Sequence, residues 1–94
     1  VVEFKVPKTT THLSWILAGG VPEAHRDQIL AQLACTGRTR AVFVSFDPRI
    51  DGPRRIYIQE WTPSPEEIAK VEADASAFLA EVERMFEMLN EAAA

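Results

Sequence analysis

The chain has a single cysteine, four glycines and no long hydrophobic run, and each scarcity excludes a class of protein. Cys35 on its own forms no internal disulfide and builds no thiolate-based zinc cluster. The apolar stretches are interrupted within a few residues, so none approaches the roughly 20 apolar residues of a transmembrane helix. We find no readable secretory signal, Gly-rich phosphate loop, nucleophile elbow or zinc-binding pattern. With 47% hydrophobic and 26% charged residues among 94, the composition is typical of one small globular domain.

The net charge of −4 conceals an uneven distribution along the chain. Residues 1–63 carry eight basic and six acidic side chains, whereas residues 64–94 carry two basic and eight acidic ones. A surface that binds phosphate needs positive potential locally and not in the total. The acidic total therefore neither excludes a nucleic-acid partner nor supports one.

Hydrophobic periodicity and turn residues predict the order β–loop–α–β–β–α, an α+β arrangement within the α/β class. Turn signals separate the second and third strands, so we expect these two strands to be antiparallel. We expect a mixed sheet with a long C-terminal helix packed on it. The expected segments are strands 1–6, 41–46 and 55–61, a loop 8–21 with one helical turn at 13–18, and helices 22–35 and 64–90.

The C-terminal helix begins at a capping box, Ser64-Pro65-Glu66-Glu67, in which a hydroxyl and a carboxylate satisfy the first free amides. Its apolar residues recur in steps of three and four, which is the spacing of a coiled-coil seam. Leu79 and Phe86 widen this stripe, so we favour packing across a sheet. The stripe consists of Ile68, Val71, Ala75, Phe78, Val82, Met85 and Leu89.

Glu3-Phe4-Lys5 places a carboxylate and an ammonium on the same face of the first strand, two residues apart. Such a pair suits a divalent metal held by the carboxylate, with the lysine beside it to steady a developing charge or to position a water. The alternative is an exposed ion pair on a strand. Taken alone, so short a pattern more often corresponds to an exposed ion pair than to a metal site.

The helix at 22–35 carries a narrow polar strip, His25, Gln28 and Gln32, between apolar flanks. This distribution suits a mostly buried helix with one strip facing a cleft, although a strip facing solvent is an equally good interpretation. His25 has three possible roles: a phosphate contact, a buried core histidine or, least favoured, a metal ligand.

Lys8, Thr11 and His12 lie in the loop after the first strand. An ammonium, a hydroxyl and an imidazole in such a loop suit contacts with phosphate oxygens. A plain polar loop explains the same residues equally well.

Several of these residues form one ordered series along the chain. It consists of Glu3-Phe4-Lys5-Val6-Pro7, Thr11-His12, Val21-Pro22, Gln28, Thr36-Gly37-Arg38 and Phe43-Val44-Ser45-Phe46-Asp47-Pro48-Arg49. The series resembles the YqaJ-like viral recombinase family, which includes the phage lambda-type exonuclease and belongs to the PD-(D/E)XK nuclease superfamily. The resemblance covers nearly the whole chain and implies a restriction-endonuclease-like core. The acid–x–Lys triplet is generic, but its combination with the helical Gln and the Asp-Pro-Arg turn is fairly specific.

The resemblance implies roles for individual residues. Glu3 is expected to bind a catalytic divalent metal, Mg²⁺ or Mn²⁺, together with the backbone carbonyl of Phe4. Lys5 is expected to orient or activate the water that attacks the phosphodiester, and Gln28 is expected to lie close to the site. The residues expected to contact DNA are Lys8, Thr11, His12 and His25.

The resemblance also implies an activity and partners. We expect a Mg²⁺-dependent exodeoxyribonuclease of phage or prophage recombination that digests duplex DNA from an end. A single-strand annealing protein is an expected partner, and the lambda enzyme itself is a ring-shaped trimer. The expected location is the cytoplasm of a bacterium or a phage-infected host.

One part of the family pattern is missing. The family's other metal-binding acid comes from the preceding strand, in a segment resembling Ser-Pro-Asp-Gly, and this chain begins two residues before Glu3. We therefore expect residues 1–94 to be the C-terminal portion of one nuclease domain, without the N-terminal helices and the first acidic strand. One carboxylate and one carbonyl bind Mg²⁺ poorly, so we expect the chain alone to be nearly inactive. The alternative is a non-catalytic DNA- or protein-binding remnant of the fold.

Overall fold

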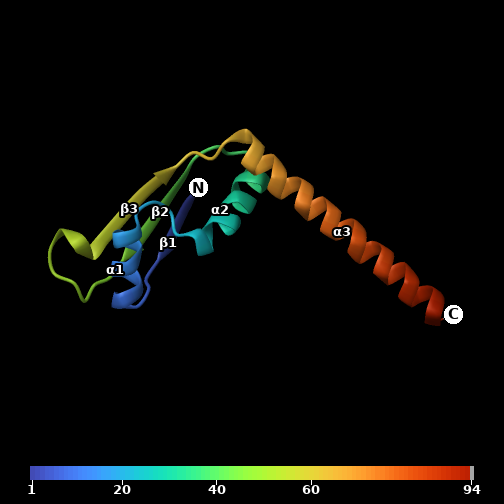
Figure 1. The fold of residues 1–94 in the computed structure, drawn as a ribbon, viewed down its shortest axis with the longest axis horizontal. Helices are drawn as coiled ribbons and strands as arrows, with labels where there is room; N and C mark the ends of the chain where they lie inside the picture. The colour runs from blue at the N-terminus through green and yellow to red at the C-terminus, as the bar shows by residue number, and fades with distance from the viewer. Residues whose placement is uncertain (94) are drawn as a thin grey trace.

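A computed structural model describes residues 1–93, and it contains a mixed three-stranded sheet, two helices beside it and one long C-terminal helix (Figure 1). The predicted fold class is confirmed. The segment expected to hold a single helical turn is instead a full helix, α1. The elements are β1 (Val2–Lys5), α1 (Thr9–Ala18), α2 (Glu23–Thr36), β2 (Ala41–Phe46), a short 3₁₀ turn (Pro53–Arg55), β3 (Ile56–Trp61) and α3 (Pro65–Ala93).

The sheet has the order β1-β2-β3, with β1 parallel to β2 and β3 antiparallel to β2, as predicted for the last two strands. Residues paired in register lie on the same face of a sheet. One face, here called the inner face, carries the row Glu3, Phe43 and Gln59. The opposite, outer face carries the row Phe4, Val44 and Ile58. Of the triplet in β1, Glu3 and Lys5 therefore lie on the inner face, and Phe4 lies on the outer face.

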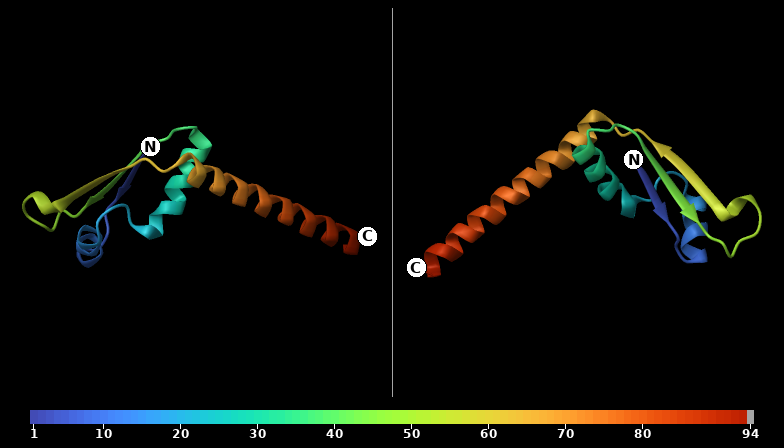
Figure 2. Two further views of the ribbon diagram at one scale, coloured as in Figure 1. Left: turned by 45° about the horizontal axis from the view of Figure 1, so that its top comes forward. Right: turned by 180° about the vertical axis from the view of Figure 1, so that it is seen from behind.

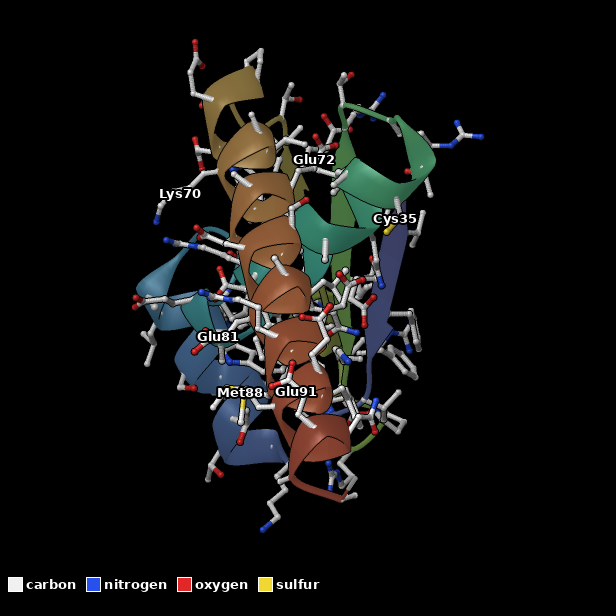
Figure 3. All side chains as sticks on the ribbon, turned by 90° about the vertical axis from the view of Figure 1, so that its right-hand side faces the viewer. Cys35, Lys70, Glu72, Glu81, Met88 and Glu91 are labelled. Carbon is white, nitrogen blue, oxygen red and sulfur yellow. The ribbon has the colours of Figure 1, made fainter. Side chains whose placement is uncertain are left out.

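The C-terminal helix does not lie on the sheet. Its capping box forms as predicted, because the Glu67 amide donates to Ser64 Oγ at 3.2 Å and the Ser64 amide donates to Glu67 Oε1 at 3.3 Å. The first turns of α3 lie against α2, and the remainder of α3 extends away from the sheet and the other helices (Figure 2). Figure 3 looks onto this projecting helix, with Glu72, Glu81 and Glu91 on its surface. The predicted packing of α3 across the sheet is wrong, because α2 already covers the inner face where α3 begins.

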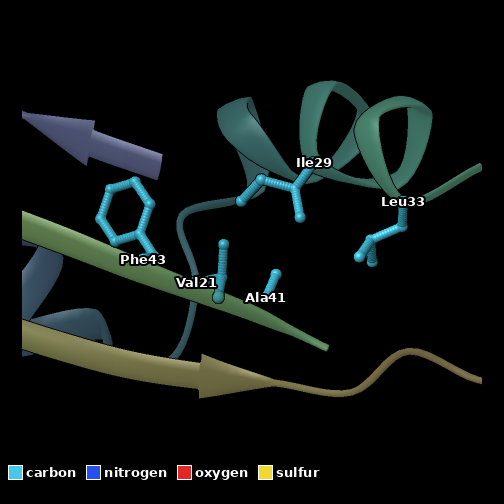
Figure 4. Packing of buried hydrophobic residues seen from close by; sticks show 5 residues of the cluster. All are labelled: Val21, Ile29, Leu33, Ala41 and Phe43. Atoms are coloured by element: carbon cyan, nitrogen blue, oxygen red, sulfur yellow. The ribbon is translucent and has the colours of Figure 1, made fainter. Parts of the chain in front are cut away.

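The hydrophobic core lies between α2 and the inner face (Figure 4). Ile29 and Leu33 of α2 pack against Ala41 and Phe43 of β2, and Val21 belongs to the same cluster. Their i, i+4 spacing puts both α2 residues on one side of the helix, which orients α2 over the strands. The same side chains fix which residues of α2 face β1.

Within residues 1–93, no helix is both long and apolar enough to cross a membrane.

Candidate active site

Glu3 lies at the centre of a small polar cluster on the inner face of β1. Lys5 Nζ is 2.9 Å from Glu3 Oε1, and Gln32 Nε2 donates a hydrogen bond to Glu3 Oε2 at 3.1 Å. The Glu3 side chain retains 12% of its accessible surface and that of Lys5 retains 30%. Each oxygen of the carboxylate therefore has its own donor, and the site stays open to solvent on one side.

This environment keeps the carboxylate charged. The hydrogen bond from Lys5 and then that from Gln32 lower the pKa of Glu3, while partial burial opposes them. The nearby His25 lowers the same pKa further through its charge. Glu3 is thus an ionised oxygen donor at neutral pH, which is the form that binds hard divalent cations.

Helix α2 brings His25 and Gln32 toward Glu3 but turns Gln28 away. Gln32 contacts Glu3, whereas Gln28 is exposed and shows no hydrogen bond to the site. The reason is helical phase, since residues seven apart lie within about 20° of each other on a helix, whereas residues three apart differ by about 60°. The polar strip was therefore identified correctly, but the glutamine beside Glu3 is Gln32. A catalytic role for Gln28 remains a prediction.

His25 is held in an aromatic cluster. Its ring stacks on Phe43 with centroids 5.7 Å apart, and Trp15 contacts it edge-on at 5.4 Å. Because Phe43 pairs in register with Glu3, this stacking places His25 beside the carboxylate. The imidazole is half-buried, so one part of it reaches solvent next to the site.

His12 is a core residue. It has no accessible surface, and its ring lies 2.7 Å from both Ser45 Oγ and the Arg54 carbonyl oxygen. A carbonyl only accepts, so Nε2 carries a hydrogen toward Arg54, and in the neutral ring Nδ1 accepts from the Ser45 hydroxyl. The predicted contact between His12 and DNA does not fit this structure, because both ring nitrogens are already used inside the protein.

The other two residues expected to contact DNA lie at the start of α1. Lys8 is exposed immediately before the helix, and its carbonyl accepts the His12 amide at 2.9 Å. Thr11 is half-buried, and its carbonyl accepts the Ser14 hydroxyl at 2.7 Å. Of the two side chains, that of Lys8 is the one free to reach a phosphate. Both DNA contacts remain predictions.

An acidic residue beyond the predicted set, Asp47, organises the end of the sheet. Arg49 donates to Asp47 Oδ1 from its amide at 3.0 Å and from Nε at 2.8 Å, and its Nη2 donates to the Pro7 carbonyl at 2.8 Å. The hydroxyl of Thr9 and, second, Arg49 lower the pKa of Asp47 to about 2. Arg49 binds Oδ1, whereas the buried Oδ2 has no partner within hydrogen-bonding distance and angle. These bonds, here called the Asp47 clamp, hold the C-terminal end of β1, just beyond Lys5, beside the C-terminal end of β2. The Asp-Pro-Arg turn is the sequence feature from which this role of Asp47 could have been predicted.

The described residues supply only part of a divalent-metal site. Glu3 is the appropriate donor, and the Phe4 carbonyl is adjacent, but residues 1–93 contain no group of three His, Cys, Asp or Glu side chains placed to share an ion. Mg²⁺ prefers a nearly complete octahedron of oxygen ligands. The donor set of this chain therefore does not fit Mg²⁺ on its own.

Comparison with solved structures identifies the kind of fold that carries this site. The chain superposes on crystal structures of LHK-Exo, an alkaline exonuclease from Laribacter hongkongensis, with TM-scores of 0.91 for the complex with dAMP and 0.89 for a second structure. Sequence identity is 36% in both cases, over 99% of this chain. The chain spans about half, 48%, of the length of those exonuclease chains. No protein-family model matches it, and neither does any curated protein.

The chain thus has a nuclease fold. Its likeness to an alkaline exonuclease extends from the backbone to the sequence, so the chain belongs to the same nuclease family as that exonuclease.

Proposed function

We propose that these residues form part of a Mg²⁺-dependent exodeoxyribonuclease of the YqaJ-like, lambda-exonuclease type. The observation that carries the proposal is the ionised Glu3 between Lys5 and Gln32 on the inner face of a nuclease fold. A charged carboxylate beside an ammonium is the pairing needed where a phosphodiester gains negative charge during hydrolysis. The 36% identity to an alkaline exonuclease supports the same reaction class.

In this proposal Glu3 and the Phe4 carbonyl supply two of the ligands of Mg²⁺ or Mn²⁺. Such an ion would supply Lewis-acid stabilisation of the phosphate oxygens. Lys5 would orient the attacking water, because its Nζ lies beside Glu3 and its side chain is partly exposed. Gln32 holds the second carboxylate oxygen and so fixes the rotamer of Glu3.

The incomplete donor set implies a contribution from outside these residues. We propose that a second carboxylate, from a strand preceding Glu3 in a longer protein, completes the metal site. The 94 residues alone are then nearly inactive, because a single carboxylate holds Mg²⁺ weakly. The chain would be the C-terminal portion of that nuclease domain, and its twofold longer solved relatives are consistent with this arrangement.

The proposed substrate is an end of duplex DNA. The relative bound to dAMP shows that a nuclease of this fold accommodates a deoxynucleoside monophosphate. In the present chain Lys8 and His25 are the proposed phosphate contacts, since Lys8 is exposed and His25 is partly exposed near Glu3. A role in phage recombination, an annealing partner and a ring-shaped trimer belong to the same proposal.

A second function is favoured by the missing ligand. With one acidic side chain at the site, the fold also suits a module that binds DNA or a protein without cleaving it. The two functions differ in whether phosphodiester bonds are broken.

The test is digestion of end-labelled linear duplex DNA with Mg²⁺ by the protein of the complete reading frame. Lys5→Ala is the site variant, and Lys70→Ala, on exposed α3, is its matched control. We expect the wild type and the control to digest the DNA from its ends, and we expect no digestion in excess chelator. In Lys5→Ala the rate of digestion should fall at least 100-fold, because removal of one electrostatic stabiliser costs about 10²–10³ in rate. Binding without digestion by the wild type would establish the second function, and digestion in chelator would contradict the metal-dependent one.

A further inference from the structure

Basic side chains gather at one end of the sheet, where β1 and β2 end and β3 begins. This end, here called the basic end, lies far from the projecting part of α3 (Figure 1). It carries five basic and three acidic residues, a net charge of +2 in a chain whose net charge is −4. The basic residues are Lys5, Lys8, Arg49, Arg54 and Arg55, and the acidic ones are Glu3, Asp47 and Asp51.

Two of the five positive charges at the basic end are already compensated within the protein. The paired residues are Lys5 with Glu3, at 2.9 Å, and Arg49 with Asp47, at 2.8 Å. Arg54 and Arg55 differ from them, because both side chains are exposed and no acidic side chain of residues 1–93 forms an ion pair with either. These two arginines therefore offer uncompensated charge to solvent.

The 3₁₀ turn that carries Arg54 and Arg55, here called the arginine turn, is tied to the interior of the protein. The buried His12 ring donates from Nε2 to the Arg54 carbonyl at 2.7 Å, and the Asp47 amide donates to the Arg55 carbonyl at 2.8 Å. Pro53 begins the turn and restricts its backbone further. A backbone that is fixed in advance loses less entropy when its side chains bind a ligand. His12, which the proposed hydrolysis does not use, thus holds the arginine turn in place.

We propose that Arg54 and Arg55 bind backbone phosphates of the duplex whose end lies at Glu3. This inference rests on the proposed function, and it adds a surface that holds the duplex beyond the site of cleavage. Strand β2 separates β1 from β3, so the backbones of these two strands lie about 10 Å apart. That distance corresponds to about three base steps of duplex DNA. One duplex can therefore reach both Lys5 and the arginine turn.

The charge of the remaining chain favours the same approach. Outside the basic end there are five basic and eleven acidic side chains, which repel a polyanion. Duplex DNA is therefore attracted to the basic end and away from α3. Contacts with phosphates position a duplex without reading its sequence, so Arg54 and Arg55 strengthen binding of every duplex alike.

The salt dependence of DNA binding tests this contact. Binding of a fluorescein-labelled linear duplex to the protein of the complete reading frame is measured by anisotropy in excess chelator, at several salt concentrations. Each lost phosphate contact reduces the slope of log K against log salt concentration by about 0.9. In the double variant Arg54→Gln, Arg55→Gln we expect a slope smaller by about 1.8, for duplexes of different sequence alike.

Two further double variants are the controls. Lys70→Gln with Arg84→Gln removes two charges from exposed α3 and leaves the slope unchanged, which separates a local contact from net charge. Arg54→Lys with Arg55→Lys keeps both charges and also retains the slope, which separates the contact from an effect on folding. A wild-type slope in the glutamine variant of the arginine turn overturns the proposal, and so does a reduced slope in its lysine variant.

Digestion of the same duplex with Mg²⁺ separates this inference from the proposed function. If the wild type binds DNA with the expected slopes but cleaves nothing, the phosphate contact stands and the nuclease function fails. If the wild type cleaves DNA and the glutamine variant keeps the wild-type slope, the nuclease function stands and the phosphate contact fails. The second result would follow if the two arginines bound an acidic protein instead.

Discussion

Gln32 Nε2 donates a hydrogen bond to Glu3 Oε2 at 3.1 Å, although 29 positions separate the two residues in the chain. The bond joins the only acidic side chain of β1 to the last turns of α2. It forms because Ile29 and Leu33, which flank Gln32 along the helix, are fixed against Ala41 and Phe43 of the neighbouring strand. The hydrophobic core therefore sets the rotation of α2, and this rotation selects the glutamine that reaches the site.

The first prediction concerns the two glutamines of α2. In Gln32→Ala we expect the pKa of Glu3 to rise, because the charged carboxylate loses a donor. Gln28→Ala, on the same helix but exposed, is the matched control and leaves that pKa unchanged. Titration of the ¹³C-labelled carboxyl carbon by NMR measures both. Equal shifts in the two variants would show that Gln32 does not contact Glu3 in solution.

The second prediction concerns Lys5. Lys5→Met removes the largest influence that lowers the pKa of Glu3, so this pKa rises further than in Gln32→Ala. Because the folded pKa lies below the ordinary value of 4.5, the ion pair contributes stability above that pH and loses it as the pH falls through the folded value. The difference in Tm between wild type and Lys5→Met is therefore present at pH 7 and disappears in acid. Lys8→Met, at an exposed residue before α1, serves as control.

The third prediction concerns the Asp47 clamp. The pKa of Asp47 falls from 3.8 to about 2 on folding, so its carboxylate stabilises the protein above pH 4, and this contribution is lost between about pH 4 and pH 2. Asp47→Asn lowers Tm at pH 7 by at least a few degrees, and the gap to the wild type narrows toward pH 2. Asp51→Asn changes an exposed acid of the same connection and leaves Tm unaltered. Thermal melts across this pH range decide the matter; a gap that stays constant would contradict the assigned role.

The fourth prediction concerns the buried His12. His12→Leu leaves the Ser45 hydroxyl and the Arg54 carbonyl without their partner, at a cost of about 1–3 kcal/mol in the free energy of unfolding for each polar group that stays buried and unpaired. Leu17→Ala, at an 88% exposed position of the same helix, has almost no effect. Urea denaturation measures both. If His12→Leu kept full stability but weakened DNA binding, His12 would be a surface contact after all.

Local structure followed closely from the sequence. Strand β2 occupies the expected residues 41–46, and the capping box at Ser64 starts α3 as predicted. These features depend on neighbouring residues alone, through alternation in a strand and amide satisfaction at a helix end. Helix α1 was underestimated, because three threonines and Gly19-Gly20 suggested a loop, whereas the burial of His12 against Ser45 of the sheet favours the helix.

The sequence by itself determined that Glu3 and Lys5 share a strand face and that a polar strip lies on α2, since both follow from fixed periods of 2 and about 3.6 residues. Tertiary structure alone decided that Gln32 meets Glu3, that both ring nitrogens of His12 bond to Ser45 and Arg54, and that α3 extends away from the sheet (Figure 2). A period fixes which residues of one element share a face. The direction of that face depends on contacts between segments far apart in the chain, here α2 against β2, and these contacts have no local signature.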